Sequence, residues 1–520
     1  MRKNVPVIIL LVLFSLPAIF ALFHSGFFQS DDGEWMVIRF SAFYQAFVDG
    51  QFPVRFLHRL NFGYGYPVAT FLYPGFMYFG IPIHLIGFGF VNTIKIVIGL
   101  SLVGSSIFTY LWLSKLFSKY ASILGAIVYL YLPYHLYDVY VRGSVGEVFA
   151  LVWLPFVFWQ IERKSTFWTS LGIALIIISH NTLALLFMPL IVLYMITKTL
   201  SSTSQRLQLY QYTSILVFGI GLASFYWLPA ITEVGYTNFS NTSISNPENY
   251  FADFGLIDFI SVGALLVVIY MLLWKKKIIH YHTIPFFVVG VLSIFLSSSL
   301  SKSIWSIAPS QYIQFPFRML SLTIPTTAFL LAALVDKVQY KKFMWNQWYR
   351  YPILVVLIAS VGYVLFFYPK TFFDKGEGYY FTNEATTTVQ DEYMPKWVKE
   401  KPTTHFKEKV KVISGDAQVS NVEYDNKNIS FKVNATSKSD IQVSTIYWPG
   451  WRDVQNNLEV GYDNLTGTMM IDVSTGKHVV HLKFEETNTR LVADLVSVIS
   501  LLILIAYSIL LKRKNEKNIK

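Results

Sequence analysis

Apolar residues occur along this chain in long blocks that are separated by short polar stretches. A helix needs about 20 apolar residues to cross the roughly 30 Å hydrocarbon core of a membrane, and the blocks approach this length. The pattern therefore predicts a polytopic α-helical membrane protein. Its predicted spans lie at approximately 5–22, 93–113, 121–137, 147–161, 166–180, 182–198, 213–232, 256–274, 283–298, 318–335, 351–367 and 491–511.

The composition supports the same fold class. Hydrophobic residues make up 54% of the 520 residues and charged residues only 14%, whereas soluble globular domains carry about 25% charged residues. A soluble globular protein, a disordered chain, collagen and a coiled coil are therefore excluded. The chain has no cysteine, which also excludes disulfides, cysteine-based zinc sites and thiol catalysis.

The net charge of +11 reports topology, because cytoplasmic loops of membrane proteins hold the excess of Lys and Arg. Residues 66–90 are apolar, but Pro67, Pro74 and Pro82 interrupt any long helix there. If this segment stays on the outer side, every basic cluster becomes cytoplasmic. We therefore expect twelve spans in the cell membrane, with both termini in the cytoplasm, and no nucleic-acid partner. The clusters are Lys115/Lys119, 162–164, 198–206, 275–277, 337–342 and 512–520.

Three domains are predicted: a transmembrane module at 1–367 with a first outer loop at 24–92, an extracytoplasmic domain at 368–490, and a last helix with a basic tail at 491–520. The outer domain contains segments that largely alternate apolar and polar residues, which is typical of an antiparallel sandwich or jelly-roll-like fold. They are 410–413, 429–433, 441–446 and 478–484. The aromatic run 447–451 either stacks on a sugar ring or packs in the core or on the membrane.

The strongest catalytic candidates follow the first span, where Asp31, Asp32 and Glu34 place three carboxylates within four residues. Carboxylates this close repel one another unless a proton or a cation lies among them. This arrangement suits a general base, or a site at Asp31 and Asp32 for a divalent cation such as Mg or Mn. The structural alternative is a helix cap provided by Asp31 or Asp32. Arg39 lies further along the same segment.

Other ionisable residues beside the spans are candidates for binding the substrate, because such groups are costly near a membrane. Arg142 and Glu147 lie five residues apart and otherwise form a structural ion pair. Arg318 stands at the outer end of a span, where it either clamps a phosphate or extends to lipid headgroups. The remaining candidates are His180 and Asn181, which otherwise form a polar turn, and His58 in the first loop.

The sequence has no Walker loop, dinucleotide-binding fingerprint, His-Glu-x-x-His or Gly-x-Ser-x-Gly motif, which argues against nucleotide hydrolysis and against zinc or serine hydrolysis. Nucleotide sugars are scarce outside the cell, so a sugar donor on the outer face would be a lipid phosphate. Such a reaction needs a base for the acceptor hydroxyl and cations for the departing phosphate.

The chain resembles the GT-C superfamily of polytopic glycosyltransferases and, more narrowly, the YfhO-like membrane proteins and the related 6-pyruvoyl-tetrahydropterin-synthase-related family. The resemblance rests on ordered motifs that run across most of the chain: Asp31-Asp32-Gly33, Gly63-Tyr64-Gly65-Tyr66-Pro67, Val141-Arg142-Gly143 with Glu147, Gln314-Phe315-Pro316-Phe317-Arg318 and Tyr447-Trp448-Pro449-Gly450-Trp451.

This resemblance implies transfer of a sugar from a polyprenyl-phosphate donor to a glycan, lipid or protein acceptor on the outer surface, usually with inversion. It further implies that Asp31 or Asp32 is the base and that Arg142 or Arg318 meets the donor phosphate. Many members of the superfamily show a single acid or an Asp-Glu pair where this chain has Asp31-Asp32, so both aspartates are retained as candidates.

Two other functions fit the sequence. A transporter or flippase would also combine many spans with charged residues, although no repeat relates the two halves. A non-catalytic protein of cell-envelope assembly would use the outer domain to bind a polymer. Replacing Asp31 or Asp32 by Asn separates the three functions, because only the transferase would lose activity while still folding and binding lipid.

Overall fold

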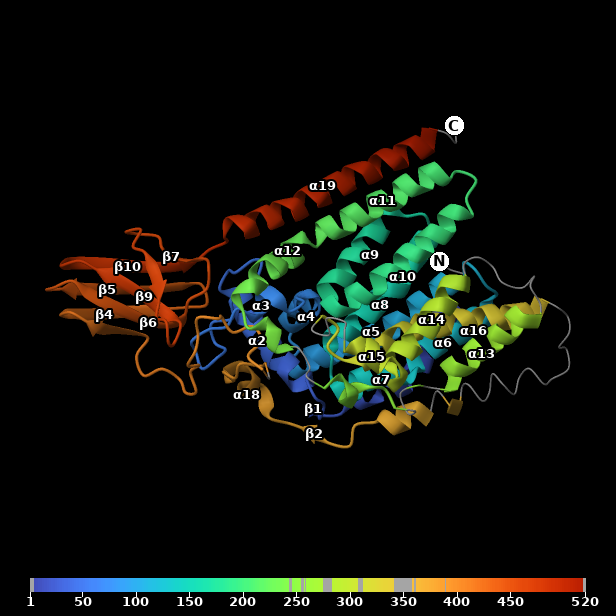
Figure 1. Cartoon of the computed structure of the whole chain (residues 1–520), viewed down its shortest axis with the longest axis horizontal. Helices are drawn as coiled ribbons and strands as arrows, with labels where there is room; N and C mark the ends of the chain where they lie inside the picture. Colours follow the sequence, from blue (N-terminus) through green and yellow to red (C-terminus); the bar gives the residue numbers. More distant parts are fainter. Residues whose placement is uncertain are drawn as a thin grey trace.

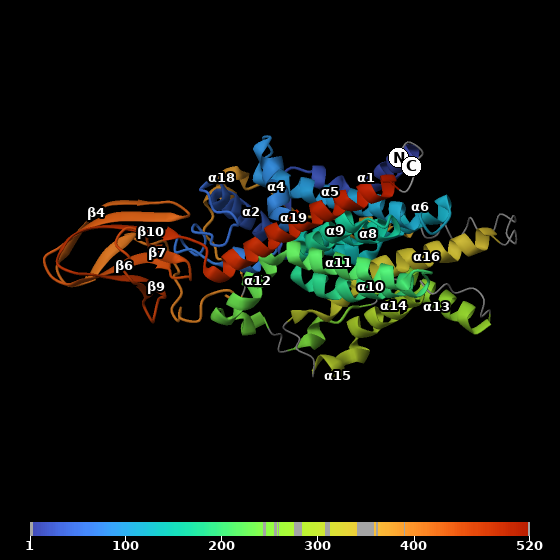
Figure 2. The ribbon, with the colours of Figure 1, turned by 90° about the horizontal axis from the view of Figure 1, so that it is seen from above.

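The computed structural model describes residues 4–242, 246–253, 257, 259–274, 283–306, 312–340, 358–359, 362–388 and 390–517. A helical region (residues 4–340) is followed by a β region (residues 410–484), and the last helix, α19 (Asn488–Lys517), returns along the helical region (Figures 1 and 2). In both views, α1 (Val5–Ile19) begins and α19 ends at the end of the helical region that lies away from the β region. The assignment of this end to the cytoplasm stays a prediction.

In the predicted span 351–367, the described residues 358–359 and 362–367 are helical, and the other nine lie outside the described residues. Named helices overlap every other predicted span. They are α1, α5 (Phe90–Leu113), α6 (Lys119–Tyr131), α8 (Val145–Glu162), α9 (Thr166–Ser179), α10 (Asn181–Leu200), α11 (Gln205–Leu222) with α12 (Ser224–Glu233), α13 (Phe259–Trp274), α14 (Thr283–Ser297), α16 (Thr323–Tyr340) and α19.

Six helices in the described part of the chain are long and apolar enough to cross a membrane. The number rises to eight if two bent pairs each count as one span. These pairs are α11–α12, bent by 67°, and α14 with the segment ending in α15 (Lys302–Trp305), bent by 83°. The protein thus has several helices that can span a membrane, and the count of twelve stays a prediction.

Burial differs strongly between these helices. In α8, 83% of the span is buried by the rest of the protein, whereas in α19 the share is 11%. A helix that is apolar on all sides and covered by protein belongs to the interior of a bundle. Polar side chains on α8 therefore face other protein groups, whereas most of α19 lies on the surface of the helical region.

The first outer loop folds against the ends of these helices. It contains β1 (Phe27–Phe28), α2 (Gly33–Val48), α3 (Val68–Phe71) and α4 (Gly75–Leu85). Residues 66–90 are divided as the prolines predict, because Pro74 precedes α4 and separates it from α3. The 11 residues of α4 are fewer than the 17–25 or so that a single span requires. Strand β1 pairs with β2 (Phe372–Phe373), which fixes the loop to the segment after the helical region.

The β region consists of two four-stranded antiparallel sheets, in the orders β4-β5-β10-β7 and β3-β6-β9-β8. Strand β5 alternates strictly between buried and more exposed residues, and the inner residues of both sheets belong to one hydrophobic core. The four predicted strand segments fall within β3, β5, β6 and β10. The strands are β3 (Val410–Ser414), β4 (Ala417–Tyr424), β5 (Asn428–Ala435), β6 (Ser439–Ile446), β7 (Trp451–Asp453), β8 (Val460–Tyr462), β9 (Thr468–Val473) and β10 (Gly476–Phe484).

The aromatic run 447–451 lies where the β region meets the first outer loop. Trp448 and Trp451 are buried. The ring of Trp448 packs edge-on against Phe71 at 5.8 Å, and that of Trp451 packs against Phe56 at 5.9 Å. Both indoles are therefore covered by protein, so these two residues serve packing between the two parts of the molecule.

Candidate functional site

The aspartate segment and the Arg142 segment lie side by side. The backbone N–H of Asp31 donates to the Val141 carbonyl at 2.9 Å, and that of Asp32 donates to the Arg142 carbonyl at 2.8 Å. Gly143 has a φ of +66°, and a Cβ atom there would lie 2.5 Å from the backbone nitrogen of Gly33. A glycine is therefore required for this close approach. Two segments more than 100 residues apart in the sequence form one site.

The side chains of the two aspartates remain available at this contact. Asp32 occupies the N-cap position of α2, but its carboxylate makes no capping hydrogen bond, so the structural alternative of a helix cap does not account for it. Asp31 lies at the surface. Partial burial and then the charge of Asp32 raise the pKa of Asp31, while Arg142 acts in the opposite direction. A carboxylate with a raised pKa is a suitable general base.

Beneath the aspartates lies a buried charge cluster, made of Asp138, Arg142, Glu147, His180 and Arg318. Glu147 is fully buried, and its Oε1 accepts from Arg142 Nη1 at 2.7 Å and from Arg318 Nε at 2.9 Å. Arg142 Nη1 also contacts Asp138 Oδ1 at 2.6 Å. Two guanidinium groups and two carboxylates thus balance one another, which a buried charge requires.

Local structure explains how each member reaches the cluster. Asp138 and Arg142 lie four residues apart on η3 (Asp138–Arg142), a π-helical turn that ends at Gly143. Glu147 is in the first turn of α8. His180 separates α9 from α10, and its Nδ1 accepts from the Leu183 backbone N–H. This bond leaves Nε2 directed at Glu147 Oε1, 3.6 Å away.

Aromatic rings cover the cluster. Arg318 lies in the first turn of η9 (Pro316–Leu322), and its guanidinium lies over the Phe315 ring at 4.9 Å. The guanidinium of Arg142 lies over Phe317 at 5.3 Å. The Gln314-to-Arg318 motif therefore supplies both a charge and the rings that shield it. Cations over aromatic faces gain further stabilisation when water is excluded.

Three predicted site residues make their contacts elsewhere. Glu34 pairs with Lys375 at 2.6 Å. Asn181 is exposed, and its side-chain oxygen accepts from the backbone N–H of the next residue. His58 is buried between the first loop and the β region, where its Nε2 accepts from Lys409 Nζ at 2.7 Å. Burial and the Lys409 charge hold the pKa of His58 well below its usual range. These contacts leave Asp31 and Asp32 as the carboxylates of the site.

Sequence reasoning missed one member of the cluster, Asp138, and two tyrosines beside it. Asp138 shares Arg142 with Glu147, and its position four residues before Arg142 is the signal that could have identified it. The Tyr134 hydroxyl donates to Glu147 Oε2 at 3.1 Å. The Tyr73 ring packs against His180 at 4.4 Å. Nothing in the sequence near Tyr73 or Tyr134 indicates either contact, because both depend on how separate helices pack.

The described residues contain no group of three His, Asp or Glu side chains that could hold a metal ion. A divalent-cation site at Asp31 and Asp32 therefore stays a prediction.

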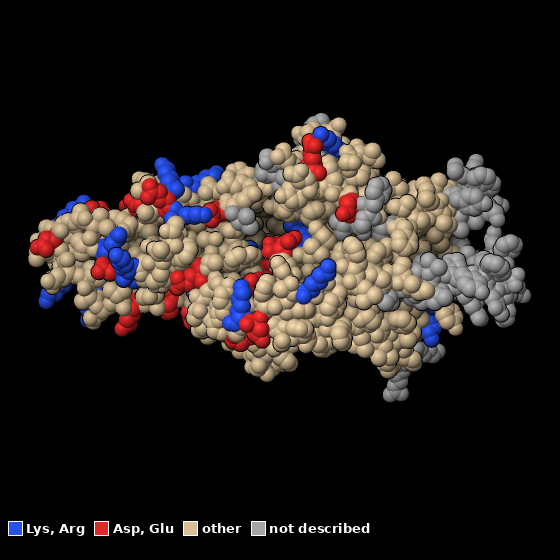
Figure 3. Space-filling model, turned by 90° about the horizontal axis from the view of Figure 1, so that it is seen from below, with Lys and Arg blue, Asp and Glu red and all other residues tan. Residues whose placement is uncertain are grey.

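Figure 3 shows one face of the molecule. Acidic and basic side chains lie together there in a hollow near the middle, while the neighbouring helical surface is mostly uncharged.

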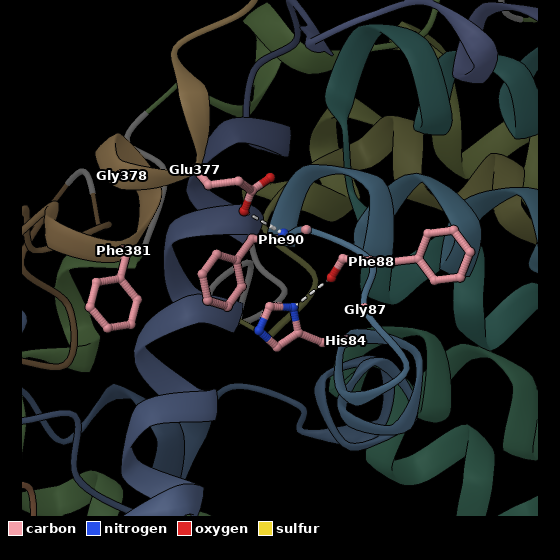
Figure 4. A pocket seen from close by; sticks show the side chains of 8 residues that line it. His84, Gly87, Phe88, Phe90, Glu377, Gly378 and Phe381 are labelled. Carbon is pink, nitrogen blue, oxygen red and sulfur yellow. Dashed lines mark hydrogen bonds between the residues drawn. The ribbon is translucent and has the colours of Figure 1, made fainter.

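A separate hollow of about 410 Å³ lies where α4, α5 and α18 (Gly376–Thr382) meet (Figure 4). Its polar groups are used within the protein. The Glu377 carboxylate accepts from the Phe90 backbone N–H at 2.7 Å, and His84 Nδ1 donates to the Phe88 carbonyl at 2.7 Å. None of the predicted site residues lines this hollow, so it does not belong to the site around Asp31 and Asp32.

Comparison with protein families identifies the chain. Residues 71–370, more than half of its length, match the family described as the 6-pyruvoyl-tetrahydropterin synthase related domain, a membrane protein. The chain belongs to this family. The match confirms the predicted resemblance to these 6-pyruvoyl-tetrahydropterin synthase related membrane proteins and includes Arg142, Glu147, His180 and Arg318. A comparison with curated proteins finds no match.

This family member is also similar to two solved transferase structures. It matches the arabinofuranosyltransferase AftD from Mycobacteria at 17% identity, with a TM-score of 0.49, over 72% of this chain and 28% of AftD. It matches the oligosaccharyltransferase of Archaeoglobus fulgidus at 15% identity, with a TM-score of 0.39, over 69% of this chain and 53% of that protein. The chain thus spans less than a third of AftD and about half of the oligosaccharyltransferase.

Proposed function

We propose that this protein is a membrane glycosyltransferase that moves a sugar from a polyprenyl-phosphate donor to an acceptor hydroxyl at the outer membrane face. The observation that carries the proposal is the contact between the Asp31-Asp32 backbone and Val141-Arg142, which holds two available carboxylates above the buried charge cluster. Membership of a membrane-protein family supports the location of this chemistry at a lipid bilayer.

In the proposed reaction, Asp31 or Asp32 removes the proton of the acceptor hydroxyl. The acceptor oxygen forms a bond to the anomeric carbon, while the bond from that carbon to the phosphate oxygen breaks. Its electron pair leaves with the polyprenyl phosphate. A base and an electrostatic stabiliser for the leaving group are the two contributions such a reaction needs.

The buried charge cluster would give the aspartates a rigid support. Glu147 neutralises Arg142 and Arg318 from below, and the Arg142 backbone in turn holds Asp32. Catalytic groups have to be held within fractions of an ångström of their working geometry. The ion pairs thus act mainly through the position of the aspartates.

Replacing each aspartate by Asn tests the proposal. We expect either D31N or D32N to lower transfer from a polyprenyl-phosphate hexose about 10²- to 10⁴-fold, which is the usual contribution of a general base. The assay follows release of polyprenyl phosphate by purified protein in nanodiscs. E248Q is a matched control, because Glu248 makes an exposed surface pair with Lys302.

The same variants separate the proposal from the alternatives. A transporter or flippase would release no polyprenyl phosphate in this assay. In D31N or D32N, it would instead show a changed rate of lipid movement. An assembly protein would not respond to either change. Unchanged transfer in both single variants and in the double variant would contradict the proposed role of this site.

A further inference from the structure

Arg39 is a buried cation with no carboxylate partner among the residues that the structure describes. It lies on the buried face of α2 and is 8% exposed. In the described part of the chain its guanidinium contacts only the Thr387 carbonyl and the sulfur of Met36, and its Nε has no partner. Arg142 and Arg318, in contrast, each contact Glu147 at less than 3 Å. Burying a charge without a counter-ion is costly, so Arg39 is set up to receive an anion.

The surroundings of Arg39 also suit an anion. Two buried tyrosines, Tyr73 and Tyr393, belong to neighbouring segments: the Tyr393 ring stacks on Phe71, two residues before Tyr73, and the chain reaches Tyr393 from Thr387, whose carbonyl accepts from Arg39. The Arg39 charge lowers the pKa of both tyrosines against the larger opposing effect of burial. Within the described residues, neither hydroxyl has a hydrogen-bond partner. A guanidinium fork with two free hydroxyl donors nearby is a suitable set of groups for a phosphate.

The position of Arg39 relative to Asp32 fits the geometry of sugar transfer. The two residues are seven apart on α2, which places them on the same side of the helix, about 10 Å apart along its axis. A base and a phosphate ligand at opposite ends of such a gap leave room for one sugar ring between them.

We propose that Arg39, with the hydroxyls of Tyr73 and Tyr393, binds the phosphate of the lipid-linked sugar donor. This assignment rests on the proposed glycosyltransferase function and names the cation that meets the leaving group. As the bond from the anomeric carbon to the phosphate oxygen breaks, the electron pair moves to that oxygen, and the charge that develops there lies beside Arg39. Asp32 receives the acceptor proton at the other end of the same helix face.

Binding of a simple lipid phosphate tests this site without any transfer step. The purified full chain in detergent is titrated with farnesyl phosphate and, separately, with farnesol. We expect the wild type to bind the phosphate at least 10-fold more tightly than the alcohol. R39Q should lose this preference, and R39K should keep part of it, because lysine keeps the charge but lacks the fork.

Matched variants control for folding. R59Q removes a half-buried guanidinium, one that is bonded to the Ser41 hydroxyl and the Ile38 carbonyl, and should keep the preference. If R39Q does not fold, Y73F and Y393F replace it, each with an expected loss of about 3-fold or more. Y226F is their control, because that hydroxyl is already bonded to the Phe71 carbonyl.

The outcomes are distinct. Folded R39Q with the full preference for farnesyl phosphate, or unchanged preference in both Y73F and Y393F, would overturn the site. Inorganic phosphate that binds as tightly as farnesyl phosphate would overturn the assignment to a lipid. If Arg39 controls phosphate binding while D31N, D32N and the double variant all transfer normally, the anion site stands and the proposed transferase mechanism fails.

Discussion

The two groups of charges in this protein are organised in opposite ways. In the buried charge cluster every charged group has an opposite charge within 3 Å, with His180 at a longer distance. Above it, the Asp32 carboxylate makes no capping bond and Arg39 has no carboxylate partner among the described residues. Paired charges stabilise a fixed geometry, whereas unpaired charges are available to a substrate. We therefore assign a structural role to the buried charge cluster and a role in substrate binding and catalysis to Asp32 and Arg39.

Removing the shared anion of the cluster should have the largest effect on stability. E147Q leaves Arg142 with Asp138 alone and Arg318 with no carboxylate from the cluster. Breaking a buried ion pair in this way typically costs about 3–5 kcal/mol. We expect a clear fall in the thermal unfolding midpoint of the purified protein, measured in detergent by intrinsic fluorescence.

The exposed pair between Glu248 and Lys302 provides the matched control for this change. Its side chains are 54% and 61% exposed at a separation of 2.8 Å, and such pairs contribute about 0–1 kcal/mol. E248Q should therefore leave the unfolding midpoint nearly unchanged. Equal midpoints for E147Q and E248Q would contradict the structural role of the cluster.

The contact between the two groups can be broken at Gly143. In G143A the new Cβ would lie 2.5 Å from the Gly33 nitrogen, at a φ of +66° that disfavours alanine. Strain of this kind costs about 1–3 kcal/mol. We expect G143A to reduce transferase activity by about 10-fold or more, because it displaces the aspartates from Arg142.

Gly235 offers the comparison for G143A, since an added Cβ there meets no atom within 4 Å. G235A should keep wild-type activity and stability. If G143A behaved like G235A in the transfer assay, the close approach of the two segments would not matter for the reaction.

The periodicity of the sequence predicted the fold better than it predicted the site. Apolar blocks and alternating strands identify most helices and four of the eight strands of the β region, because both patterns follow from local burial. Short strands such as β7 and β8 carry too few residues to show a period. The sequence placed Asp31-Asp32 and Arg142 on the same predicted outer face, but it did not predict that their backbones are in contact.

Which charge is paired is not visible in a sequence. Arg39, Arg142 and Arg318 look alike along the chain, and only the packing of α8 and η9 shows that Glu147 neutralises two of them. His58 was a further candidate from the first outer loop, but the fold places it against Lys409 at the β region. These assignments depend on contacts between residues 171 and 351 positions apart in the sequence.

The smallest expected effect is a pH dependence at Asp31. Partial burial and the Asp32 charge raise its pKa in the folded protein above 3.8, so the folded state binds the proton more tightly than the unfolded state does. The resulting stabilisation is complete below pH 3.8 and is lost as the pH rises through the folded-state pKa. D31N should therefore be at least as stable as the wild type at pH 7.

Unfolding midpoints measured from pH 3 upward check this sign. The advantage of D31N at neutral pH should decline as the pH falls toward 3.8. A D31N protein that is less stable than the wild type at pH 7, but equal to it in acid, would show that the Asp31 carboxylate is held by a favourable partner instead of being available to a substrate.

Disulfide trapping tests the central claim most directly, since the chain has no cysteine of its own. Cysteines replace Asp31 and Val141, whose backbones are joined by a 2.9 Å hydrogen bond, and the control pair joins Asp31 to Ser201 beyond α10. Oxidation in native membranes should link the first pair and not the second. Absence of the Asp31–Val141 link, or equal yields for both pairs, would contradict a single site that joins the aspartates to the buried charge cluster.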